Sequence, residues 1–325
     1  MRKKLGAAKR RSRAIITGSP AAETPGAGVI AAAPAPETLE LEGRRVGWAL
    51  YGERHARGGV VYLHGFPGSC LEPLVVAEAL RSAGLALLAF DRPGYGASAT
   101  RAGDARDPGL AARIAGALVD RLGWQRYALL AVSGSGPAAV AALARPDPRL
   151  AGALLLAVFP PLFRGRPRAD SDLLRVHAAL RRRCPPLLGL ESRLVARHFG
   201  RRPARLRRRL LRLLPPPDRL SLGSAPLAAV LEASWARALV GGGGRGLLVD
   251  LAHFFDPLDP PPPPPFPCLS VHGGRDRVVP PALQDYLCEA LPYLEARRWP
   301  QAGHFSWVET HAREILETLK EWLAG

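Results

Sequence analysis

Three side chains that together could activate a nucleophile occur in this sequence in the order Ser, Asp, His. Ser133 follows the apolar run 127–132, Asp276 follows the run 268–272, and His304 follows the run 294–299. A serine hydroxyl is a weak nucleophile unless a neighbouring histidine takes its proton and a carboxylate orients that histidine. The pattern predicts acyl-transfer chemistry, with Ser133 as nucleophile, His304 as base and Asp276 as the acid that orients the base.

The segment around Ser133 has the composition of a sharp turn between a strand and a helix. In Ala131-Val132-Ser133-Gly134-Ser135, small residues stand two positions on either side of Ser133, as the tight turn of a nucleophile elbow requires. Ser135 is the alternative nucleophile, but Pro137 would then be one flank and fits the turn poorly. Taken singly, the two serines could be helix caps, Asp276 a turn residue and His304 a cap or surface residue. Their common order and placement favour a catalytic site.

A second turn could supply the hydrogen-bond donors that such chemistry needs. The segment His64-Gly65-Phe66-Pro67-Gly68-Ser69 follows the apolar run 59–63. A glycine-containing turn at this place can direct a backbone N–H at a developing oxyanion. We expect the N–H groups of Phe66 and Gly134 to form this oxyanion hole.

The elements that must position these residues alternate along the chain. Short apolar runs predict buried strands, and the segments between them have helical patterns. This alternation predicts an α/β fold, in which a mostly parallel sheet carries helices on both faces and binds ligands at the carboxyl ends of its strands. The predicted strands are 45–51, 59–63, 85–90, 127–132, 153–159, 268–272 and 294–299, and the predicted helices are 71–83, 108–122, 137–144, 281–291 and 306–323.

The block 160–255 interrupts this alternation. It is rich in Arg and Leu and mostly helical in pattern, which is typical of a lid inserted between two sheet strands. The prolines at 260–265 predict a stiff connector into the next strand. The predicted domains are a basic, Ala- and Pro-rich tail (1–38), a core in two pieces (39–159 and 256–325) and a helical cap (160–255).

The formal charge of +17 on 325 residues is concentrated in two places. Residues 1–13 hold seven basic residues and no acid, and residues 164–212 hold sixteen Arg and three acids, which leaves −3 on the rest. Peripheral contact with an anionic membrane through 193–214 is one interpretation. The other is a solvated face from a biased codon source, because only four of the 45 basic residues are Lys. We expect no nucleic-acid partner, because aromatic residues are not interleaved with the Arg clusters.

The four cysteines are far apart and form neither a zinc motif nor a disulfide framework, so a reducing compartment is expected. No apolar run approaches the ~20 residues of a membrane span. Residues 1–36 fit a plain disordered tail or an organelle transit peptide, so the protein is expected in the cytoplasm or in an organelle such as a chloroplast or mitochondrion. The sequence does not indicate an oligomeric state.

Five motifs together make the chain resemble the α/β-hydrolase superfamily, in the branch with a one-piece helical cap before the acid-bearing strand. They are His64–Ser69, Phe90–Ser98, Ala131–Pro137, Gly273–Asp276 and Gly303–Phe305. The resemblance implies the nucleophile role for Ser133, the acid for Asp276, the base for His304, the oxyanion hole for Phe66 and Gly134, and a structural role for the turn at Asp91. Ala131 and Ser135 stand where the family more often has Gly.

The resemblance implies a serine hydrolase that cleaves an ester or a related small acyl compound and needs neither cofactor nor metal. A serine nucleophile disfavours epoxide hydrolase and haloalkane dehalogenase activity, which rely on Asp. The alternative is a hydrolase-like scaffold that binds a ligand or partner with little turnover.

Overall fold

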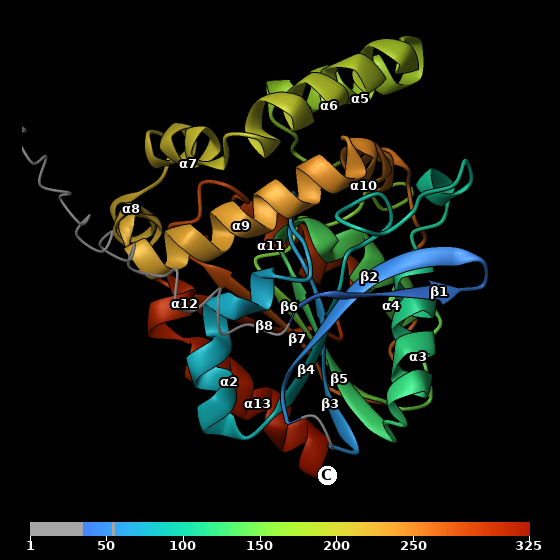
Figure 1. Ribbon diagram of the computed structural model, residues 1–325, viewed down its shortest axis with the longest axis vertical. Helices are drawn as coiled ribbons and strands as arrows, with labels where there is room; N and C mark the ends of the chain where they lie inside the picture. The colour runs from blue at the N-terminus through green and yellow to red at the C-terminus, as the bar shows by residue number, and fades with distance from the viewer. Residues whose placement is uncertain (1–34, 54–55) are drawn as a thin grey trace, which may run out of the picture.

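The computed structural model describes residues 35–53 and 56–325, in which one eight-stranded sheet carries helices on both faces (Figure 1). The strand order is β1-β2-β4-β3-β5-β6-β7-β8. The β1–β2 and β2–β4 pairs are antiparallel, and all other pairs are parallel. The strands are β1 (Glu37–Leu41), β2 (Arg44–Gly52), β3 (Gly58–Leu63), β4 (Ala86–Phe90), β5 (Arg126–Val132), β6 (Leu150–Leu156), β7 (Cys268–Gly273) and β8 (Glu295–Trp299). The predicted fold class is confirmed.

Two hydrophobic cores lie on the two faces of the sheet. Along β3, Val61 and Leu63 join one core, whereas Val60 and Tyr62 join the other, because successive side chains of a strand point to opposite faces. The first core is covered by α3 (Leu110–Leu122), α4 (Gly136–Ala144) and α11 (Ala282–Ala290). The second is covered by α2 (Ala77–Ala83), α12 (Trp307–Thr310) and α13 (Ala312–Ala324). A strand buried on both faces has no polar alternation, which explains the short apolar runs of the sequence.

The predicted elements are present with a few differences. The strand predicted over 153–159 is β6, which ends at Leu156. The edge strand β1 was not predicted, because its sequence ETLEL has little apolar content and half-exposed side chains. The helix predicted over 71–83 starts as a 3₁₀ turn, η1 (Glu72–Val76), and the last predicted helix is divided at His311 between α12 and α13. The prolines at 260–265 lie outside helices and strands, as predicted for a connector.

Six helices between β6 and β7 occupy most of the predicted cap. These inserted helices are α5 (Asp172–Arg183), α6 (Pro185–Gly200), α7 (Pro203–Leu211), α8 (Pro216–Gly223), α9 (Ala225–Gly242) and α10 (Arg245–Phe255). In Figure 1, α9 and α10 cross over one end of the sheet, and α5, α6 and α7 form the layer farthest from it. The boundaries drawn between core and cap stay a prediction.

The predicted tail, 1–38, lies outside the described residues up to position 34, and β1 begins at Glu37, two residues before the predicted start of the core. Residues 1–36, which fit a disordered tail or an organelle transit peptide, also lie outside the described residues up to position 34. The cellular location therefore stays a prediction. Among the helices of the described chain, none combines the length and the hydrophobicity needed to cross a bilayer.

Candidate active site

Ser133 is the first residue after β5 and has a backbone conformation that side chains seldom adopt. Its φ angle is +53°, in the left-handed region, so the chain reverses sharply before α4 begins at Gly136. The Ser135 hydroxyl is buried and donates a hydrogen bond to the Val132 carbonyl at 2.9 Å. The Ser135 hydroxyl is therefore engaged inside the turn, which disfavours Ser135 as the alternative nucleophile.

The chain brings Ser133, His304 and Asp276 together from the ends of three parallel strands. The Oγ of Ser133 lies 3.0 Å from Nε2 of His304, and Nδ1 of His304 lies 2.7 Å from Oδ2 of Asp276. Because the carboxylate only accepts, Nδ1 carries the proton and Nε2 accepts from the serine hydroxyl. In this geometry, Nε2 of His304 can take the proton of the Ser133 hydroxyl.

Asp276 is held by groups of its own loop. Its Oδ1 accepts the N–H groups of Val278 and Val279, each at 2.8 Å. The ring of His272 donates from Nε2 to the Val279 carbonyl at 2.8 Å and is itself buried. These bonds leave Oδ2 directed at His304, so the orientation of the acid is determined by local backbone.

The environment of His304 favours its protonated form. Burial alone would lower the pKa of His304, but the charge and hydrogen bond of Asp276, together with the charges of Asp218 and Glu72, more than offset this. The pKa of His304 is therefore raised above its usual value of 6.5. The same carboxylates would stabilise the imidazolium that forms when His304 accepts a proton.

A carboxylate of the inserted helices, Asp218 in α8, binds the loop that carries His304. Its Oδ2 accepts the N–H of His304 at 2.7 Å, and its Oδ1 accepts those of Phe305 and Ser306 at 2.8 and 3.0 Å. A Cβ at Gly303 would lie 2.2 Å from Oδ2 of Asp218, so only glycine permits this approach. No motif in the sequence predicts a role for Asp218, whose only signal is an acid after a proline run, at the edge of a very basic block.

The loop after β3 lies against the turn at Ser133, as predicted for an oxyanion hole. A Cβ at Gly134 would lie 2.3 Å from the Cβ of Phe66 and 3.0 Å from its nitrogen, so the two predicted donors are adjacent. Gly65 packs beside Ser133. Among the described residues, no acceptor is found for the N–H of Phe66. The arrangement can offer backbone N–H groups to an oxygen bound next to Ser133.

Glu72 binds the loop after β3 and was not predicted from the sequence either. Its Oε1 accepts the N–H of Gly65 and the hydroxyl of Tyr62, both at 2.9 Å. Burial raises the pKa of Glu72 to about 7, although these bonds and the charges of Arg92 and His304 act to lower it. A sequence signal was absent, because a single Glu at the start of a helix is ordinary.

Arg92 and Asp250 connect the same loop to the inserted helices. The guanidinium of Arg92 donates to the carbonyls of His64 and Gly65, both at 3.1 Å, and pairs through two bonds with Asp250 of α10. The hydroxyl of Tyr95 donates to the same carboxylate at 2.7 Å. His64 is neutral in this network, since Nε2 accepts the N–H of Arg92 and Nδ1 faces the Gly65 carbonyl, and burial holds its pKa well below the usual value.

The turn at Asp91, predicted to be structural, joins two loops to α9. Its buried carboxylate accepts the N–H groups of Cys70 and Ala97, each at 2.9 Å, and pairs with Arg237. The Ser69 N–H donates to the hydroxyl of Ser234 in the same helix at 3.0 Å. The inserted helices are thus attached to the loops that surround Ser133 by several buried polar contacts.

The surroundings of the site are apolar on one side. Phe159, whose N–H donates to the Ser133 carbonyl at 2.8 Å, belongs to a buried cluster that includes Leu188, Phe254 and Val279. The ring of Phe66 packs against that of Phe254 with centroids 5.5 Å apart. Among the described residues, no group of three His, Cys, Asp or Glu side chains is placed to hold a metal ion.

Comparison with known proteins agrees with this architecture. The profile of the alpha/beta hydrolase fold matches residues 59–309. A bromoperoxidase from Bacillus anthracis is 18% identical, with a TM-score of 0.62 over 90% of this chain and 100% of its own. A thermophilic esterase from Thermogutta terrifontis is 20% identical, with a TM-score of 0.61 over 90% of this chain and 98% of its own.

The structure of the epoxide hydrolase CorEH has a TM-score of 0.64 at 18% identity, over 89% of this chain and 98% of its own. Search among curated protein sequences finds no match. At these identities the structural likeness concerns the fold, whereas the profile match spans most of the chain. The chain belongs to the α/β-hydrolase fold family.

Proposed function

We propose that this hydrolase is a serine hydrolase that cleaves an ester, or a related small acyl compound such as a thioester, lactone or amide, through an acyl-enzyme. The observation that carries the proposal is the continuous chain of contacts from Ser133 Oγ to His304 Nε2 at 3.0 Å and from His304 Nδ1 to Asp276 Oδ2 at 2.7 Å. The sharp turn at Ser133, with φ at +53°, supports the same assignment.

The proposed reaction has two halves. Ser133 Oγ attacks the acyl carbon while His304 Nε2 takes its proton, and the N–H groups of Phe66 and Gly134 stabilise the negative oxygen of the tetrahedral intermediate. The intermediate collapses, the leaving alcohol takes the proton from His304, and the acyl group stays on Ser133. Water then attacks this ester with His304 as base, and the acid is released with Ser133 restored. Asp276 stabilises the imidazolium in both halves.

The nature of the nucleophile and of its surroundings supports acyl substrates. Epoxide hydrolases attack with a carboxylate, and the corresponding position here is a serine, which forms an acyl ester instead. The apolar cluster around Phe159 and Phe254 favours an uncharged, apolar acyl or alkyl group over an ionic one. Esterase neighbours of the same fold, among them a putative aryl esterase from Burkholderia cenocepacia, are compatible with this choice.

The nucleophile is tested with a fluorophosphonate probe, which forms a covalent bond with an activated serine. We expect wild-type protein and Ser135→Ala to be labelled, because the Ser135 hydroxyl is bonded to Val132. We expect Ser133→Ala to lose the label. Equal labelling of Ser133→Ala and wild type would refute the assignment.

Turnover is tested on a panel of short-chain aryl esters and thioesters. We expect Ser133→Ala to lower kcat by about 10⁶-fold and Asp276→Asn by about 10⁴-fold, as in other Ser-His-Asp sites. If wild type turns over no member of the panel faster than Ser133→Ala, the scaffold that binds a ligand with little turnover becomes the better explanation.

A further inference from the structure

The inserted helices carry an exposed surface whose composition differs from the rest of the molecule. It is formed by the outer sides of α6 and α7 and by the turn between them, in the layer farthest from the sheet (Figure 1). We call it the outer basic face and define it by Leu187, Leu190, Leu194, Arg197, Arg201, Arg202 and Arg209, all of which are exposed. It overlaps the segment 193–214 whose sequence raised contact with a membrane.

Leucines form a stripe along one side of α6. Leu187, Leu190 and Leu194 follow each other at helical spacing and are 48, 50 and 58% exposed. Exposed leucines scattered singly are ordinary, but three aligned on one helix form a continuous apolar strip about 10 Å long. Such a strip is typical of a helix that lies at an interface between water and an apolar phase.

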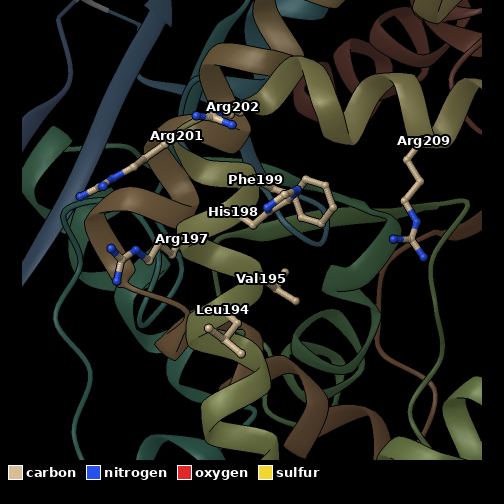
Figure 2. A pocket seen from close by; sticks show the side chains of 8 residues that line it. All are labelled: Leu194, Val195, Arg197, His198, Phe199, Arg201, Arg202 and Arg209. Carbon is tan, nitrogen blue, oxygen red and sulfur yellow. The ribbon is translucent and has the colours of Figure 1, made fainter.

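Arginines continue the stripe toward the C-terminal end of the helix. Arg197 lies three residues after Leu194, and Arg201 four residues after Arg197, so both fall on the same side. With Arg202 and Arg209 they border a hollow of about 600 Å³, whose wall includes Leu194 and Phe199. Figure 2 shows Arg197, Arg201 and Arg202 around α6 and Arg209 reaching down from α7 on the far side of the hollow.

These arginines have no acidic partner in the part of the chain that the structure describes. Ion pairs elsewhere in the inserted helices engage Arg181 with Asp256 and Arg207 with Glu232, but the salt bridges of the described residues include none of Arg197, Arg201, Arg202 and Arg209. Unneutralised cations beside an apolar strip match the two components of an anionic bilayer, the charged headgroups and the acyl chains.

We propose that the outer basic face docks on an anionic membrane surface. The leucines of α6 enter the headgroup region, while the arginines spread their apolar stems along it and place their guanidinium groups at the lipid phosphates and carboxylates. Nucleic acid fits less well, because its single strands are bound through stacking on successive aromatic rings, and the hollow offers only the half-buried ring of Phe199 and the imidazole of His198. The proposal does not depend on the catalytic activity.

The test measures co-sedimentation of the full chain with vesicles of phosphatidylcholine alone and of phosphatidylcholine mixed with phosphatidylserine. We expect binding only to the mixed vesicles, and loss of binding at high salt. The Arg197, Arg201, Arg202→Ser triple variant should bind roughly 100-fold more weakly, since each arginine near such a surface contributes about fivefold. The Leu190, Leu194→Ser double variant, which keeps every charge, should bind about tenfold more weakly.

The matched control is Arg106, Arg121, Arg145→Ser, which removes three exposed charges from the hydrolase body and should bind as wild type does. Far-ultraviolet circular dichroism checks that each variant is folded. Absence of binding to the mixed vesicles at low salt overturns the proposal. Equal weakening in the control also overturns it, because binding would then depend on net charge alone. Undiminished binding of both face variants overturns it as well and would assign binding to residues 1–13. Binding that depends on the arginines but not on the leucines would overturn the insertion of the α6 leucines and leave only electrostatic contact with the headgroups.

Discussion

At the residue scale, His304, the proposed catalytic base, is held from two directions. Its ring contacts Asp276, which lies in the loop after β7, and its backbone contacts Asp218, which lies in the inserted helix α8. The carboxylate of Asp218 accepts three consecutive N–H groups, of His304, Phe305 and Ser306, so it determines both where this loop lies and part of the negative field around the ring. Asp218 is therefore a positioning residue for the proposed base.

Replacing Asp218 by Asn should affect rate and pH dependence together. The amide keeps one acceptor oxygen but places an NH₂ donor against at least one of the three N–H groups, so His304 is less well placed and kcat should fall about 100-fold. The base must be neutral to act, so the raised pKa of His304 places the acid limb of kcat/KM above pH 6.5 in the wild type. Loss of a nearby negative charge lowers that pKa, and the limb should move toward lower pH. Both effects are read from pH–rate profiles on an aryl ester.

The control is Ser221→Ala, on the same helix, which removes the 2.6 Å bond to Glu309 but leaves the His304 loop untouched. We expect it to leave the acid limb where it is. If Ser221→Ala shifts the limb as far as Asp218→Asn does, the effect comes from loosening of α8 and not from Asp218.

At the element scale, α10 is joined to the core by a buried ion pair rather than by apolar packing alone. The Arg92 and Asp250 side chains are 4 and 2% exposed, and the same guanidinium binds the two carbonyls of the loop that precedes Phe66. A buried pair of this kind costs desolvation to form, but the loss of one partner leaves an uncompensated charge in the interior.

Asp250→Asn should therefore lower the free energy of unfolding by about 3–5 kcal/mol. The matched control is Asp107→Asn, which breaks the pair with Arg113 at the surface, where the two side chains are 40 and 58% exposed. That change should cost less than about 1 kcal/mol. Urea unfolding curves measure both values, and equal losses would contradict the role given to the buried pair.

At the scale of the whole molecule, charge is distributed very unevenly. Residues 164–212 carry a net charge of +13, most of it on the outer inserted helices, whereas the sheet and its covering helices are nearly neutral. Repulsion among like charges destabilises the element that carries them and is weakened by salt.

The thermal unfolding midpoint at pH 7 should accordingly rise with sodium chloride, as the screening length falls from about 30 Å to about 8 Å. In the Arg182, Arg208, Arg209→Ser variant, the rise of the midpoint with salt should be smaller by about 40%, because repulsion scales with the product of the charges. The Arg106, Arg121, Arg145→Ser control should respond as the wild type does. Calorimetry at several salt concentrations makes this comparison, and a midpoint independent of salt would contradict it.

Much of the fold could be predicted because its signals are local. The runs at β3, β5 and β6 are apolar without alternation, since these strands are buried on both faces. The edge strand β1 was missed because half-exposed residues impose little pattern. The division at His311 and the early end of β6 at Leu156 were missed as well, because element ends depend on contacts with neighbouring segments.

The candidate site divides in the same way. Ser133, Asp276, His304, Phe66 and Gly134 were predicted because each lies next to a strand end within a short motif. Glu72, Arg92, Asp218 and Asp250 were not predicted as parts of the site. Asp218 is 86 residues from His304, and Asp250 is 158 residues from Arg92. No local pattern records contacts across such separations.

The sequence by itself predicted the α/β class, seven of the eight strands and five residues of the candidate site. Those features follow from side-chain hydrophobicity and from steric limits on turns, which act between near neighbours in the chain. Only the tertiary structure decided that the Ser135 hydroxyl is hydrogen-bonded inside the turn, that Asp218 binds the loop of His304, and that Asp250 pairs with the arginine that binds the loop before Phe66. It also decided that the exposed leucines of α6 lie beside arginines that have no acidic partner among the described residues. These depend on how distant segments pack, and burial and hydrogen bonding between them are settled only when the whole chain is folded.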